Sequence, residues 1–170
     1  MGLNYVDLDP TTRPMMIAEF TDDLAKSAIY VSGRLTAAGR SAWPALLREA
    51  LAAHDDDWLA SELETKGLLE AKELRQGKPV DVPVTAHWTL AQGEFNHFYI
   101  RGVCRRAVAE ARVVRAYRAR YSGEPRASSL AVDGTDFDPA VLLADTRARS
   151  FGSTSQGFPG PNSGMSVKLV

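Results

Sequence analysis

The side chains best suited to chemistry in this sequence crowd into the segment 94–101, EFNHFYIR. Glu94, His97 and Arg101 follow one another at intervals of three and four residues, so on a helix they share one face. A carboxylate, an imidazole and a guanidinium so placed could move protons, but acid–base catalysis also needs a pocket around them. Asn96 and Tyr99 stand among the same aromatics. The segment therefore predicts a buried polar network or a contact surface, with a possible polar site at Glu94, Asn96, His97 and Tyr99.

A second candidate site is the arginine-rich segment 101–126. It carries eight arginines, no lysine and two glutamates, a net charge of +6, whereas residues 1–75 carry eight basic and thirteen acidic side chains, a net charge of −5. The total of −1 conceals this division. Arginine presents a rigid fork of donors that fits carboxylates, phosphates and aromatic faces. The candidate interaction residues are Arg101, Arg105, Arg112, Arg115, Tyr117, Arg118, Arg120 and Tyr121.

Three interpretations of the arginine-rich segment stay open. In the first, its arginines pair with the acidic N-terminal half, within one chain or between two, which would give a self-complementary surface. In the second, the arginines hold phosphates while Tyr117 and Tyr121 stack on nucleic-acid bases. The isoelectric point of 6.3 counts against this second interpretation. In the third, the segment is a solvated polar face.

The sequence lacks the familiar catalytic and metal-binding motifs. Gly77-Lys78 is followed by Pro79 and does not form a phosphate-binding loop, and the serine-hydrolase, kinase and zinc-protease patterns are absent. The three histidines and Cys104 match no zinc-ligand spacing. We therefore expect no metal and no cofactor, a buried and unreactive Cys104, and a protein that is not an enzyme.

The elements that must position these groups follow from apolar spacing. Asp9-Pro10 and Asp138-Pro139 each pair a capping residue with a proline suited to the first helical position, and they predict helices over 10–26 and 138–149. Apolar side chains three and four residues apart predict a helix hairpin over 41–54 and 58–67. The same spacing predicts an amphipathic helix over 94–111, with Glu94, Arg101, Arg105 and Arg112 opposite its apolar stripe.

Alternating residues predict the strands. Residues 113–121 alternate strictly and indicate a strand, and 29–35 is a shorter candidate. Segment 75–85 contains two prolines and is expected to be an extended loop or an edge strand. We expect a single α+β domain over 1–150, built from several amphipathic helices around a small sheet. A Gly/Pro/Ser-rich tail, 151–170, would dock on the domain or on a partner, with 165–169 as an added strand.

Two stretches, GEFNHFYIRGVCRRA at 93–107 and PGPNSGMSVKL at 159–169, resemble those of a family of small bacterial proteins of uncharacterised function. The resemblance covers most of the chain and implies no activity.

The division of charge favours a non-enzymatic, self-assembling or particle-associated structural protein that forms a homo-oligomer, and a phage or prophage origin would suit it. The alternative is a nucleic-acid-binding protein that uses segment 101–126. Residues 1–10 show no secretory pattern, and no apolar run is long enough to cross a membrane. We therefore expect no membrane partner and a location in the cytoplasm or within a virion or particle.

Overall fold

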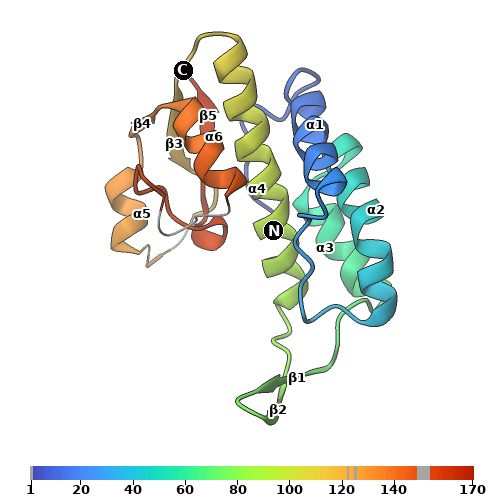
Figure 1. Ribbon diagram of the computed structural model, residues 1–170. Coiled ribbons are helices and arrows are strands. Elements are labelled where there is room, and N and C mark those ends of the chain that lie inside the picture. Colours follow the sequence, from blue (N-terminus) through green and yellow to red (C-terminus); the bar gives the residue numbers. More distant parts are fainter. Residues whose placement is uncertain (1, 122, 125, 149–153) are drawn as a thin grey trace.

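A long helix, α4 (Ala86–Ala109), runs through the centre of the molecule. Figure 1 shows the computed structural model, which describes residues 2–121, 123–124, 126–148 and 154–170. Three helices from the first half of the chain lie on one side of α4, and a small sheet with two short helices lies on the other (Figure 1). The protein is a single α+β domain, which confirms the predicted fold class.

The N-terminal helices confirm the sequence prediction. The Asp9 carboxylate accepts hydrogen bonds from the backbone N–H groups of Thr11 and Thr12 and so caps the first helix. Asp55 caps the third helix in the same way, through the N–H of Trp58. The second and third helices pack together as the expected hairpin. These helices are α1 (Thr12–Ala25), α2 (Ala37–Ala53) and α3 (Asp56–Thr65).

The sheet of the second half is antiparallel, in the order β4-β3-β5. β3 (Val114–Arg118) confirms the predicted strand, and β5 (Met165–Leu169) forms where alternation indicated one. β5 pairs with β3 of the same chain along its whole length, from Val114 opposite Leu169 to Arg118 opposite Met165. The remaining elements are α5 (Ala127–Val132), β4 (Asp136–Phe137), α6 (Pro139–Arg147) and a short 3-10 helix, η1 (Pro161–Ser163).

α6 confirms the predicted C-terminal helix, and Asp138 caps it by accepting from the N–H groups of Ala140 and Val141. Residues 149–153, where we expected this helix to end and the tail to begin, lie outside the described residues.

α4 differs from the predicted amphipathic helix in two ways. It begins at Ala86 rather than near residue 94, and every residue from 91 to 104 is buried, including Glu94 and Arg101. The physical reason is its position: α1 and α3 pack on one side of α4, and α6 and β5 pack on the other. A helix covered on both sides must bury its polar side chains as well as its apolar ones.

The predicted strand at 29–35 is wrong. This segment is a turn-containing loop whose one ladder contact is an isolated bridge between Leu35 and Leu69. The Ser32 hydroxyl accepts from the backbone N–H of Arg34 and stabilises the turn. The Trp43 indole N–H donates to the carbonyl oxygen of Tyr30 and uses an acceptor that a ladder would need. Residues with high β propensity therefore lie in a loop here, because β propensity alone does not form a strand without a partner.

Segment 75–85, expected to be an extended loop or an edge strand, contains the edge strand β2 (Lys78–Asp81), which pairs with β1 (Lys72–Arg75) in a hairpin. Its two-residue turn consists of Gln76 and Gly77, with φ values of 51° and 76°. Two positive φ values are typical of the turn that matches the natural twist of a hairpin. Figure 1 shows that the hairpin projects away from the rest of the molecule.

Within the described residues, no helix is both long and apolar enough to cross a membrane.

Candidate functional site

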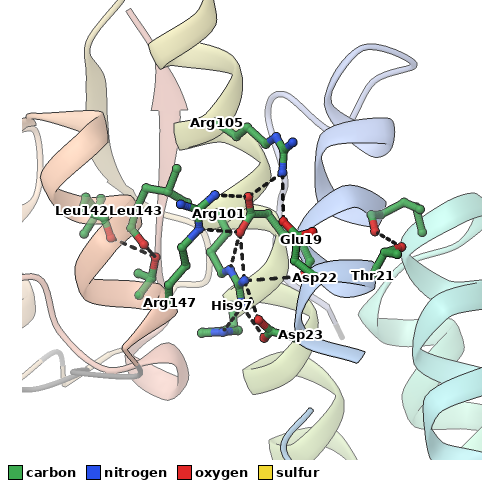
Figure 2. A network of polar contacts seen from close by, with 12 residues as sticks. Glu19, Thr21, Asp22, Asp23, His97, Arg101, Arg105, Leu142, Leu143 and Arg147 are labelled. Atoms are coloured by element: carbon green, nitrogen blue, oxygen red, sulfur yellow. Dashed lines mark hydrogen bonds and ion pairs between the residues drawn. The ribbon is translucent and has the colours of Figure 1, made fainter. Parts of the chain in front are cut away.

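Several charged side chains of the predicted sites belong to a buried network around Glu19 of α1 (Figure 2). The Glu19 side chain is 0% exposed. Its carboxylate accepts from Arg101 at 2.9 Å, from Arg105 at 2.9 Å and from Arg147 at 2.6 Å. These three arginines come from α4 and α6, so one carboxylate joins three helices.

Arg101 is the centre of the network and is 1% exposed. It also donates to Asp23, with the shortest N···O distance at 2.6 Å, and its Nη1 lies 3.2 Å from Nε2 of His97. Because a guanidinium only donates, Nε2 of His97 is the acceptor in this contact. The guanidinium carbon also lies 5.0 Å from the centre of the Phe98 ring. Contacts with two carboxylates, an imidazole and an aromatic ring hold this buried guanidinium in a fixed position.

The network fixes the ionisation of Glu19. Burial acts to raise the pKa of this carboxyl, but hydrogen bonds from Arg147, Arg101 and Arg105 outweigh it and lower the pKa to about 2. Glu19 is therefore a permanent anion at neutral pH and a poor proton donor. The two clefts described below include neither His97 nor Arg101 in their walls.

The described contacts of the possible polar site predicted at Glu94, Asn96, His97 and Tyr99 lead to different parts of the molecule. Asn96 donates to the carbonyl oxygen of Met165 at 2.9 Å and accepts from the Ser166 hydroxyl at 2.7 Å, so it binds α4 to β5. The Tyr99 hydroxyl accepts from the backbone N–H of Asp7 at 2.9 Å, and burial raises the pKa of its phenol well above the usual value. His97 faces Arg101, and Glu94 lines a cleft.

Most of the predicted interaction residues contact other parts of the same chain. Arg115 holds Asp136 through two hydrogen bonds, of 2.5 Å and 2.9 Å. Arg112 pairs with Glu110 and donates to the carbonyl oxygen of Val170. The arginines of 101–106 pair with the acidic residues of the first half: Arg101 and Arg105 with Glu19, Asp22 and Asp23, and Arg106 with Asp9. The arginines of segment 101–126 are thus largely paired with acidic side chains of the same molecule.

The end of β3 holds the remaining predicted interaction residues. The Tyr117 hydroxyl donates to the carbonyl oxygen of Asn4, and Arg120 donates to the Gln92 side chain. Tyr121 is 88% exposed, and Nη2 of Arg118 has no hydrogen-bond partner among the described residues. Among the described residues of segment 101–126, this end carries an exposed aromatic ring next to arginines in sequence, a combination that nucleic-acid binding uses.

A cleft of about 940 Å³ lies between the two halves of the chain. Loop 30–34, Arg40 and residues 69–74 form one wall, and the first half of α4 forms the other together with Asn162. The two stretches that carry the family resemblance, 93–107 and 159–169, come together on this second wall. A Cβ added at Gly93 would lie 3.1 Å from the Asn162 side chain. A cleft of this volume, lined by both polar and apolar groups, is suited to binding a ligand or a chain segment.

The hairpin borders this cleft, and its strands pack mainly against each other. An ion pair between Arg34 and Glu73, with N···O distances of 2.8 Å and 2.9 Å, connects the hairpin to the body. Leu74 at its centre is 78% exposed. A free strand edge presents backbone groups with which a strand of another chain can pair.

Sequence reasoning missed the residues that now form this candidate site, Glu73, Leu74 and Arg75. One local signal could have found them. The dipeptide Gln76-Gly77 separates two short runs of four residues, which is the spacing of a hairpin with a two-residue turn. The prolines at 79 and 83 instead favoured a single extended loop or edge strand, because proline is confined to strand edges.

The described residues contain no group of three or more histidine, cysteine or acidic side chains that could hold a metal ion. Cys104 is buried, and burial raises the pKa of its thiol well above the usual value. A second, smaller cleft of about 470 Å³ lies between α1 and the end of α2, with mostly apolar walls.

Comparison with family models, with curated proteins and with solved structures finds no match to this chain.

Proposed function

We propose that the protein is a non-enzymatic, self-associating structural protein whose contact between copies is the β1–β2 hairpin. The observation that carries this proposal is the exposure of Leu74 on a hairpin whose strands pack mainly against each other. The proposal includes a role in a larger particle of phage or prophage origin, in the cytoplasm or in a virion.

The internal ion pairs support a contact at the hairpin rather than at the arginine surface. Arg101 and Arg105 are committed to Glu19, and Arg115 is committed to Asp136. Using Arg101 between copies would require breaking its buried ion pairs, and removing a partner from a buried ion pair costs about 3–5 kcal/mol. The hairpin would exchange only an ion pair on its surface, between Arg75 and Glu73 of the same strand, and surface pairs contribute little to stability.

The limited stability of an isolated hairpin also favours a partner. A single two-stranded hairpin is at best marginally stable in water, and three or more strands or a packed face are usual. Among the described residues, β1 and β2 form a separate two-stranded sheet and pack mainly against each other. A second copy of the protein could supply both the strands and a cover for Leu74.

Sedimentation velocity over a wide concentration range tests this proposal. We expect the wild-type protein to associate reversibly. A variant in which residues 72–81 are replaced by a Gly-Ser link should stay monomeric, because Ala71 and Val82 already lie close together, joined by a 3.0 Å backbone hydrogen bond. The matched control is Arg112→Gln on the arginine surface, which should associate like the wild type. A wild-type protein that is monomeric at every concentration would refute self-association.

Nucleic-acid binding is a second candidate function, favoured by the exposed Tyr121 ring beside Arg118 and Arg120. Base stacking on an exposed aromatic residue contributes about 1–3 kcal/mol per base. If this function is present, fluorescence anisotropy with labelled oligonucleotides at about 50 mM salt should show binding that weakens steeply as salt rises. Tyr121→Ala should reduce it. Unchanged anisotropy in dilute salt would exclude this candidate.

A further inference from the structure

The free edge of β1 faces the cleft. Lys72, Glu73 and Leu74 all line it, and no residue of β2 does. Successive side chains of a strand point to opposite faces. Three consecutive residues can line one cleft only if the cleft runs along the edge of the strand, so the unpaired backbone groups of β1 border open space.

The hairpin register shows that β1 is the edge able to accept another strand. Arg75 and Lys78 flank the two-residue turn, and such a pair is hydrogen-bonded across the ladder. The next pair, Leu74 and Pro79, is therefore of the other kind, whose backbone groups point outward. Leu74 presents an N–H and a carbonyl oxygen to the free edge of β1. Pro79 has no N–H to present on the outer edge of β2.

The side chains of β1 complement a second copy of the same strand. Glu73-Leu74-Arg75 reads as acid, apolar, base, so in an antiparallel pair centred on Leu74 each glutamate lies opposite an arginine. The two leucines then lie opposite each other. Leu74 is also opposite Pro79 within its own hairpin. The pair of hairpins would thus carry a continuous apolar row, Pro79, Leu74, Leu74 and Pro79, across four strands.

We propose that two copies of the protein associate about a two-fold axis through β1, in antiparallel register centred on Leu74, and form a four-stranded sheet in the order β2-β1-β1-β2. This inference rests on the proposed self-association and specifies its interface. A two-fold contact uses the same patch on both copies, which is why a self-complementary strand fits it. Each Glu73 would keep its bond to Arg34 and exchange Arg75 of its own strand, now at 2.8 Å, for Arg75 of the second copy.

Charge exchange tests the register. Glu73→Arg and Arg75→Glu, each alone, place like charges opposite each other twice in the dimer. Each single variant should associate about tenfold or more weakly than the wild type, because cross-strand charge pairs act in both directions. An equimolar mixture of the two variants restores every opposite-charge pair and should regain wild-type association as a heterodimer. The double variant Glu73→Arg/Arg75→Glu is again self-complementary and should also associate with itself.

The control is Arg34→Gln, which removes the bond from the body to Glu73 but leaves β1 unchanged, and it should associate like the wild type. Sedimentation velocity with one fluorescently labelled variant reads out the heterodimer. If the wild type associates but both single variants associate equally well, the β1 interface is wrong while self-association stands. If the single variants are monomeric and their mixture stays monomeric, the register centred on Leu74 is wrong. A monomeric wild type overturns self-association itself.

Discussion

At the scale of single residues, Glu19 controls the stability of the helical core. Glu19→Gln leaves the shape but removes the charge that Arg101, Arg105 and Arg147 share, and uncompensated buried charges are costly. We expect a loss of about 3 kcal/mol in the free energy of unfolding at pH 7, measured by urea denaturation. The control Asp22→Asn, whose side chain is 53% exposed, should change it by less than about 0.5 kcal/mol.

The pH dependence of the same residue follows from its lowered pKa. The carboxylate is ionised in the folded state down to a pKa of about 2, whereas in the unfolded chain it protonates near pH 4.5. Its contribution to stability is therefore complete above pH 4.5 and is lost as the pH falls from 4.5 towards 2. Glu19→Gln should lack this part of the acid transition. An identical acid transition in both proteins would contradict the assigned role.

The pKa of Asp56 is raised, whereas that of Glu19 is lowered. Burial raises the pKa of this carboxyl to about 6, even though the backbone N–H of Leu3 donates to it, and the neighbouring Asp55 and Asp57 add repulsion. The folded state holds the proton more tightly than the unfolded chain, so stability falls as the pH rises from about 4 to 6. Asp56→Asn keeps an acceptor for Leu3 and should raise stability at pH 7.5 by about 2 kcal/mol. Thermal melts at pH 7.5 and pH 4 check this prediction, since the gain should shrink at pH 4.

At the scale of elements, the close approach of α1 and α4 depends on Gly102. A Cβ added there would lie 2.5 Å from Cγ of Met16 and 3.1 Å from its backbone nitrogen. Helix propensity alone would favour alanine by about 1 kcal/mol. Because backbone cannot move aside as a side-chain end can, we expect the clash to dominate and Gly102→Ala to lose about 1–3 kcal/mol by urea denaturation. Gly33→Ala, with open space around its Cβ, is the control and should be nearly neutral. A stabilised Gly102→Ala would show that α1 can shift.

The elements also show what local sequence pattern can and cannot predict. The helices that follow Asp9 and Asp138, and the alternating strand β3, were predictable because capping and periodicity are encoded within a few residues. The burial of α4 was not, because it results from several elements, distant in sequence, that close around it on folding. The loop at 29–35 has strand-like composition, but a strand needs a partner, and local pattern cannot show that none lies alongside.

At the scale of the whole molecule, the division of charge was visible in the sequence, but its use was not. Opposite net charges in two segments are compatible with pairing within one chain or between two. The choice depends on α1 lying against α4, which brings Glu19 and Asp23 to Arg101. The candidate contact lies instead at the hairpin, where short strands and prolines give a weak pattern. Charge composition is therefore more informative about the ion pairs between α1 and α4 than about the candidate contact at the hairpin.

The C-terminal tail belongs to the core of the molecule. Met165, Ser166 and Val167 are 0% exposed, Asn96 bonds to the first two, and the N–H of Leu169 donates to Asp7 near the other end of the chain. Removing residues 165–170 would expose β3 and leave the buried Asn96 without these partners, at a combined cost of about 5–8 kcal/mol. This approaches the whole stability of a small domain, so we expect the truncated chain to lose its cooperative thermal transition in circular dichroism. Removing Val170 alone, which is 43% exposed, should leave the transition nearly unchanged. A truncated protein that melts like the wild type would show that β5 is an accessory strand.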